Sequence, residues 1–157
     1  MTDFALARPI TLADAAAAAG LIRAAFGGIR PPLAPPPSAL GETEESVLAQ
    51  IAGGGAVVWR HAVLVGVVLW ERRAPALYLK RLAVDGTMRG QGVATSLLRA
   101  GEAAARGMGL ARLDVGVRLV LVGNRRLFAG QGFTEGAVHA HPGFDAPTWV
   151  EMHKALS

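Results

Sequence analysis

The 157-residue sequence contains no cysteine, and that absence alone excludes several classes of site. Disulfide bonds, thiolate metal sites and cysteine nucleophiles all require a thiol. Aromatic residues are scarce at 6%, and only 18% of the residues are charged. Hydrophobic residues reach 52%, which is enough for a core and argues against a disordered chain. We therefore expect one compact domain over residues 1–157.

Long apolar runs are also missing. The longest, 62–70, has nine residues, whereas a membrane-spanning helix needs about 20. Near the N-terminus, Asp3 and Arg8 interrupt any apolar segment, so no signal peptide is expected. These observations predict a cytoplasmic protein with no membrane partner.

Basic residues modestly outnumber acidic ones. Sixteen Lys and Arg against twelve Asp and Glu give a net charge of +4, and the bases are scattered along the chain. Ordinary surface charge explains this distribution, and attraction to an anion such as a phosphorylated cofactor is the alternative. No basic helix or interleaving of aromatic and basic residues occurs, so no nucleic-acid partner is predicted.

Residue patterns in the first third of the chain predict a strand and two helices. The strand covers 4–10 and ends near Pro9, and Thr11 with Asp14 resembles a capping box that begins the first helix. A proline-rich loop over 27–41 precedes a second helix that starts near Thr43. The buried stripe expected for the first helix consists of Leu12, Ala15, Ala19, Ile22 and Phe26.

The rest of the chain reads as hairpins followed by a crossover. Three strands rich in β-branched and aromatic residues are predicted at 57–59, 63–70 and 76–84. The later elements are a helix over 92–108, a strand over 113–119, a short helix over 124–131 capped by Asn124, a strand from Phe133 and a strand over 148–152. The resulting order, β-α-α-β-β-β-α-β-α-β-β, indicates a mixed α/β sheet.

The loop between the third predicted hairpin strand and the long helix is the most informative segment. It contains three glycines and Arg89 between Val84 and Val93. Free backbone N–H groups at a helix start attract anions, glycines allow close approach, and an arginine adds a charge-assisted hydrogen bond. A simple tight turn is the alternative. The loop matches neither a P-loop nor a Rossmann fingerprint.

Residues 89–94, Arg-Gly-Gln-Gly-Val-Ala, resemble the Arg/Gln-x-x-Gly-x-Gly/Ala signature of the GNAT superfamily of N-acetyltransferases. The hydrophobic strand 78–84 matches as well, and so does an Asn-x-x-x-Phe-x-x-x-Gly-Phe pattern that starts at Asn124 and ends at Phe133. The predicted element order agrees with that fold along nearly the whole chain. The resemblance implies transfer of an acetyl group from acetyl-CoA to a primary amine of a small molecule or peptide, directly within a ternary complex.

The resemblance also implies which residues bind acetyl-CoA. The strand before the loop would pair with the pantetheine arm through the backbone of Leu82, Ala83 and Val84. Beside Arg89, the pyrophosphate would be held by the amides of Gly90, Gln91, Gly92, Val93 and Ala94. Asn124 would lie near the pantetheine, although helix capping is a sufficient explanation for it.

Amide formation from a thioester needs a neutral amine, stabilisation of the oxyanion and protonation of the leaving thiolate. In many members of the family a tyrosine protonates the thiolate, and the matching position here is Phe128, which has no hydroxyl. Tyr78, the single tyrosine, is the candidate acid, with packing on its strand as the alternative.

The candidate bases are His139 and His141, which would share one face of a strand. Half-exposed histidines without a role are the simpler explanation. Glu71, Glu135 and Asp145 also remain candidates. No third ligand lies at a useful spacing from the two histidines, so no metal is expected.

Segments 27–41 and 141–147 correspond to regions that usually shape the acceptor site in the family. Arg30, Lys80, Arg81 and Arg118 suggest an acceptor with a carboxylate or phosphate, although surface charge or cofactor binding also explains them. The alternative function is an acyl-CoA-binding sensor or regulatory module without turnover. A homodimer is also considered, because exposed strands of the family often pair across dimers.

Overall fold

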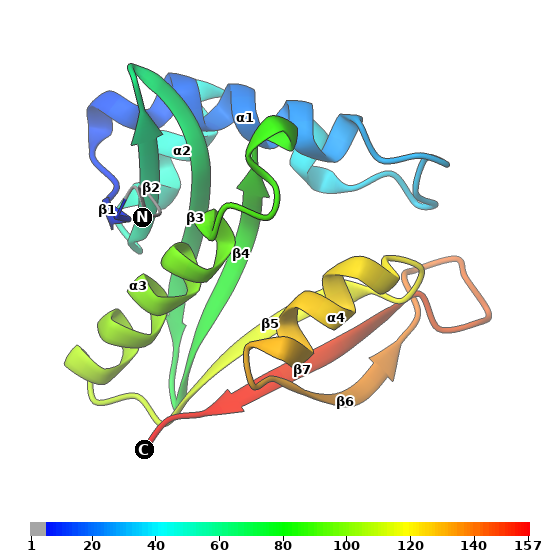
Figure 1. Ribbon diagram of the computed structural model, residues 1–157. Helices are drawn as coiled ribbons and strands as arrows, with labels where there is room; N and C mark the ends of the chain where they lie inside the picture. The colour runs from blue at the N-terminus through cyan, green and yellow to red at the C-terminus, as the bar shows by residue number, and fades with distance from the viewer. Residues whose placement is uncertain (1–5) are drawn as a thin grey trace.

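The computed structural model describes residues 6–157, and Figure 1 shows how its helices and strands are arranged. Residues 1–5 lie outside the described part, and with them Asp3 and the start of the strand predicted at 4–10. Apart from three short 3-10 helices, the elements follow the order predicted from the sequence. No helix within the described residues is both long and apolar enough to cross a membrane.

Seven strands form a single mixed sheet in the order β1-β2-β3-β4-β5-β7-β6. The strands are β1 (Arg8–Pro9), β2 (Gly55–Arg60), β3 (Val63–Arg73), β4 (Ala76–Val84), β5 (Arg112–Arg118), β6 (Thr134–His139) and β7 (Trp149–Ala155). The helices are α1 (Ala15–Gly27), α2 (Glu44–Ile51), α3 (Val93–Gly107) and α4 (Val122–Gly130). All neighbouring strands are antiparallel except β4 and β5, which α3 connects as a parallel crossover.

Helices cover both faces of the sheet (Figure 1). On one face α1 and α2 enclose a core with residues of β2 and β3, including Ile22, Val47 and Leu69. On the other face α3 and α4 enclose a second core, to which β4 contributes Leu77 and Leu79. Because side chains alternate along a strand, Tyr78 and Lys80 of β4 point to the α1 and α2 face.

Several predicted details are wrong, each for a local reason. Leu12 is 67% exposed, because it lies in a 3-10 turn before α1 and is out of phase with the buried stripe. The helix predicted over 92–108 ends at Gly107, so Met108 lies beyond it and is exposed. Asn124 does not cap its helix, because α4 begins two residues earlier, at Val122. His141 is not on a strand with His139, because β6 ends at His139.

Asp14 connects β1, α1 and β2 through a buried carboxylate. Its side chain is hydrogen-bonded by the Arg8 guanidinium at 2.9 Å, by the backbone N–H of Thr11 at 2.8 Å and by the Trp59 indole at 3.0 Å. Burial alone would raise the pKa of Asp14, but these donors outweigh it and lower the pKa to about 2. The sequence motif of Thr11 and Asp14 thus does more than begin a helix.

We predict that Asp14→Asn lowers the free energy of unfolding by on the order of 2 kcal/mol at pH 7. The folded-state pKa of Asp14 lies below its ordinary value of 3.8, so this contribution is present above about pH 4 and is lost as the pH falls towards 2. Urea denaturation between pH 7 and pH 2.5 measures it. Asp145→Asn, at an exposed carboxylate, is the matched control. A difference between wild type and Asp14→Asn that stays constant with pH would contradict this account.

Candidate active site

The central feature of the site is that β4 and β5 separate. They pair only from Ala76 with Arg112 to Leu79 with Val115, and each strand then continues without the other. Figure 1 shows the resulting wedge, which opens towards the start of α3. A cleft of about 1250 Å³ occupies it, lined by β4, β5, the starts of α3 and α4, and the segment after α1.

A β-bulge lies in β4 just beyond the last residue that pairs with β5. The register between β3 and β4 shifts between Val67 and Leu69, and Arg81 adopts a left-handed φ of 58°. A bulge bends its strand and increases the local twist. The bulge at Arg81 is therefore placed where β4 turns away from β5.

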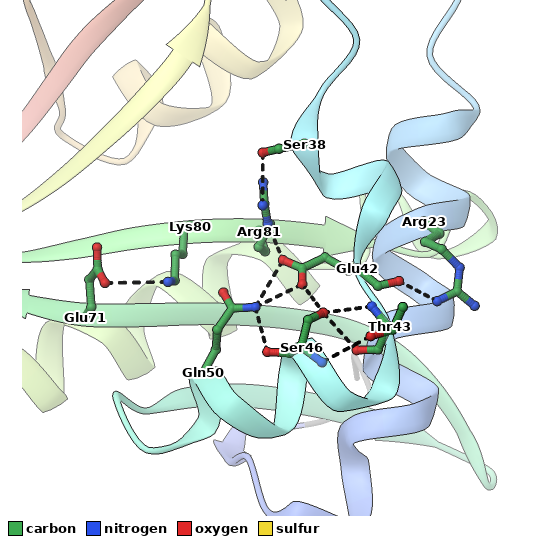
Figure 2. Close-up of polar contacts among 9 residues, drawn as sticks. All are labelled: Arg23, Ser38, Glu42, Thr43, Ser46, Gln50, Glu71, Lys80 and Arg81. Atoms are coloured by element: carbon green, nitrogen blue, oxygen red, sulfur yellow. Dashed lines mark hydrogen bonds and ion pairs between the residues drawn. The ribbon is translucent and has the colours of Figure 1, made fainter.

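Glu42 holds Arg81 in that conformation (Figure 2). The Arg81 guanidinium donates from Nε to Glu42 Oε2 at 2.7 Å and from Nη2 to Ser38 Oγ at 3.0 Å. Glu42 is 4% exposed and also accepts hydrogen bonds from Ser46 Oγ at 2.5 Å and Gln50 Nε2 at 2.9 Å. This network, the Glu42 cluster, ties α2 and the segment before it to β4.

Ionisation of Glu42 follows from these contacts. Burial alone would raise the pKa of Glu42, but the hydrogen bonds from Ser46, Arg81 and Gln50 together lower it below its ordinary value. Glu42 is thus an anion whose charge is satisfied within the protein. Glu42 was not predicted as a site residue, although Glu42, Ser46 and Gln50 are spaced four residues apart, as on one face of a helix.

The glycine-rich loop ends at the start of α3. Gly90 and Gly92 have φ values of 76° and 81°, a conformation that favours glycine, and α3 begins directly afterwards at Val93. The first hydrogen bond into this turn runs from Ser96 N–H to Gly92 O, so the preceding N–H groups of the turn have no helical acceptor. These groups lie at the mouth of the wedge.

Nine of the ten residues predicted to bind acetyl-CoA line the cleft. They are Leu82, Ala83, Val84, Arg89, Gly90, Gly92, Val93, Ala94 and Asn124. Gln91 does not line it, and its N–H donates to Met88 O at 3.3 Å. Thr95 also lines the cleft and was not predicted; its position one helical residue after Ala94 was the available signal.

Of the predicted catalytic residues, Tyr78 and His141 line the cleft. The Tyr78 hydroxyl oxygen is 3.3 Å from where a Cβ on Gly116 would lie, just past the point at which β4 and β5 separate. The Arg73 guanidinium covers the Tyr78 ring at 3.9 Å from its centroid. Phe128 also lines the cleft, and its ring packs edge-on against Phe133.

The two predicted histidines are not brought together. His141 hydrogen-bonds Thr148 through its backbone and its ring, and burial and the charge of Arg118 lower the pKa of His141. His139 lies outside the cleft lining, paired with Glu151 and stacked on Trp149 with ring centroids 4.4 Å apart. No cluster of three or more His, Asp or Glu within residues 6–157 has the arrangement of a metal site.

The other candidate bases do not line the cleft. Glu71 is paired with Arg73 and Lys80, Glu135 is paired with Arg125, and Asp145 is exposed. Trp149 was missed as a site residue. Its pairing with Arg118 across β5 and β7 brings it to the cleft, and this neighbour relation is not visible in the sequence because the two residues are far apart in the chain.

Comparison with known proteins agrees with this geometry. Residues 30–133 match the family model described as "Acetyltransferase (GNAT) family". The chain therefore belongs to the GNAT acetyltransferase family, and it is an acyl-CoA-dependent N-acetyltransferase, the class of enzyme that uses acetyl-CoA as co-substrate. No curated protein matches the chain at a significant level.

Solved structures show the same fold. A ribosomal-protein-alanine N-acetyltransferase from Brucella melitensis has a TM-score of 0.75 and 20% identity, covering 96% of this chain and 99% of that one. The ribosomal-protein-S18-alanine N-acetyltransferase from Escherichia coli has a TM-score of 0.74 and 17% identity, covering 97% of this chain and 94% of that one. The PaiA N-acetyltransferase of Thermoplasma acidophilum, in complex with coenzyme A, has a TM-score of 0.74 and 16% identity, covering 96% of this chain and 98% of that one.

We predict a strong energetic coupling between Glu42 and Arg81. Either Glu42→Gln or Arg81→Gln leaves the other group of a shielded ion pair without its charged partner, and each lowers the free energy of unfolding by about 1–3 kcal/mol. The double variant costs less than the sum of the two, with a coupling of about 1–2 kcal/mol. Chemical denaturation of the four proteins measures this cycle.

Glu45→Gln, at an exposed carboxylate on the same helix, serves as the matched control and changes stability by less than about 0.5 kcal/mol. Additive effects of the Glu42 and Arg81 substitutions would show that the pair does not hold the bulge.

Proposed function

We propose that this chain transfers the acetyl group of acetyl-CoA directly to a primary amine of a small molecule or peptide, within a ternary complex. The observation that carries the proposal is the wedge between β4 and β5, which ends at the open amides of α3. Acetyl-CoA supplies an acetyl thioester, the electrophile for the amine. No acyl-enzyme is needed, in agreement with the absence of cysteine.

The residues of the wedge suit a coenzyme A thioester. The edge of β4 that faces β5 is unpaired from Lys80 to Val84 within the described chain, so its backbone can bind the amide groups of a pantetheine arm. The start of α3 suits the pyrophosphate, because the N–H groups before Ser96 have no helical acceptor and, with the helix dipole, attract an anion. Arg89 and Asn124 are exposed beside it.

The proposed roles in catalysis follow from position and charge. His141 accepts the proton of the amine, since its lowered pKa keeps the imidazole neutral at physiological pH. A backbone N–H of β4 between Leu82 and Val84 stabilises the oxyanion. Tyr78 donates a proton to the leaving thiolate from its position where the strands separate. His139 supports Trp149 rather than acting as the base.

The cofactor site predicts stabilisation by ligand and a role for Arg89. Acetyl-CoA at 100 times its Kd raises the free energy of unfolding by about 2.7 kcal/mol. Arg89→Gln removes a charge-assisted hydrogen bond to phosphate and raises the Kd about tenfold or more. Calorimetry measures both the stabilisation by acetyl-CoA and the Kd. Arg99→Gln, at an exposed arginine of α3, is the control and leaves the Kd unchanged. Absence of binding to wild-type protein would remove the basis of the proposed function.

The proposed base predicts a specific pH profile. Because His141 must be neutral to accept a proton and its pKa is below its ordinary 6.5, kcat falls only as the pH drops below about 6.5. His141→Gln lowers kcat about 100-fold or more and removes this acid limb. His139→Gln, the matched control, keeps it. If the double substitution leaves the acid limb unchanged, neither histidine is the base.

A second candidate function is an acyl-CoA-binding sensor with the same fold and no turnover. Phe128 favours it, because this buried side chain lines the cleft at the position where many family members carry the tyrosine acid. Stabilisation by acetyl-CoA without thiol release against a broad amine panel is the outcome expected for this alternative.

A further inference from the structure

The lining of the cleft carries a strong excess of positive charge. It includes five bases, namely Arg30, Lys80, Arg81, Arg89 and Arg118, and one carboxylate, Asp85. Asp85 lies in the glycine-rich loop, where it accepts the Thr87 N–H at 2.9 Å. Arg89 belongs to the same loop. The part of the cleft away from this loop, towards Tyr78 and Trp149, therefore has cations and no carboxylate in its described lining.

Three of the four cations in that part already have partners in the protein. Figure 2 shows that Arg81 is held by the buried Glu42 and that Lys80 is paired with Glu71. The Lys80 Nζ lies 3.6 Å from Glu71 Oε2. Arg30 is exposed and donates to the carbonyl oxygens of Gly27 and Ile29.

Arg118 is different. It stands at the end of β5, half-buried, and no carboxylate within residues 6–157 lies at ion-pair distance from it. Its guanidinium makes one hydrogen bond to a described residue, from Nη1 to Pro35 O at 2.8 Å. A guanidinium has five N–H donors, so most of those of Arg118 are available to a ligand. Burial of a cation without a counter-charge costs free energy, and an anionic ligand beside Arg118 would reduce that cost.

The positive charge of Arg118 also acts on its neighbour His141. Burial and the Arg118 charge both lower the pKa of His141, and burial lowers the pKa of Arg118 itself. The same positive field acts on an amine that enters the cleft and favours its neutral, nucleophilic form. A purely cationic acceptor such as a polyamine is repelled there.

We propose that the acceptor is a small amine that also carries a carboxylate or phosphate, and that Arg118 binds this anionic group. The inference rests on the proposed function and names its class of acceptor. A planar fork of N–H donors matches both anions. A small acceptor is favoured because the hydrogen bonds of Arg118 to Pro35 and of Arg81 to Ser38 hold the segment after α1 across this side of the cleft.

Matched pairs of amines test the proposal with the full-length protein and acetyl-CoA, by thiol release. One arm compares free α-amino acids with their carboxamides, and the other compares aminoalkyl phosphates with the corresponding amino alcohols. The best anionic member of a pair is expected to exceed its neutral partner at least tenfold in kcat/KM. The arm with the larger ratio identifies the anion.

Variants of Arg118 separate anion binding from support of the loop. Arg118→Gln brings the anionic-to-neutral ratio of kcat/KM close to 1, because the anionic amine loses more than its neutral partner, and Arg118→Lys retains part of the ratio. Arg72→Gln, at an exposed arginine of β3, leaves the ratio unchanged. A role confined to holding Pro35 would lower turnover of both members equally, and that result overturns the proposal.

A binding readout avoids dependence on turnover. The pKa of His141, followed by NMR, is expected to rise in Arg118→Gln and also when the anionic amine is added to wild-type protein, because each removes or offsets the nearby positive charge. An unchanged pKa of His141 in both cases overturns the proposal.

Two results of the activity assay also overturn it: acetylation confined to acidic peptides, and equal turnover of neutral and anionic amines. Both results leave the proposed function standing. Absence of acetyl-CoA binding in calorimetry instead identifies failure of the proposed function.

Discussion

The functional geometry depends on the separation of β4 from β5 after four residue pairs. Parallel strands normally continue to pair because unpaired backbone N–H and C=O groups lose their hydrogen bonds. Here the loss is concentrated on one edge of β4, beside the open start of α3. The bulge at Arg81 turns β4 away, and the buried Glu42 compensates for the left-handed backbone by holding the Arg81 side chain. A carboxylate in the segment before α2 thus maintains a gap in the sheet.

The fold was largely predictable from the sequence because its signals are local. Val93, Leu97 and Leu98 repeat with helical spacing, β-branched residues mark β2 to β4, and α2 begins beside Thr43, near where its start is predicted. The errors arose where tertiary context overrides a local signal. Asn124 suits a helix cap, yet α4 begins earlier, and His141 alternates with His139 only if the strand continues past residue 139.

The site was predictable in part. The glycines and Arg89 are contiguous in sequence, so their placement at one end of the cleft followed from the motif. The pairing of Glu42 with Arg81, the place of Trp149 and the state of Arg118 were not predictable, because each depends on a residue far away in the chain. Four basic residues suggested an anionic acceptor, and the structure divides them by their partners: Arg81 and Lys80 face carboxylates, Arg30 binds carbonyl oxygens, and Arg118 faces none in the described chain.

The unpaired edge of β4 has a consequence for the behaviour of the protein in a crowded solution. An exposed strand edge is a template on which another chain can add a strand, and it thereby promotes aggregation. In this fold the edge is recessed inside a wedge, and the positively charged Lys80 and Arg81 stand where it begins. Recession of the edge limits the room in which a strand of another chain could pair with it. The wedge that leaves this edge of β4 unpaired thus also shields it.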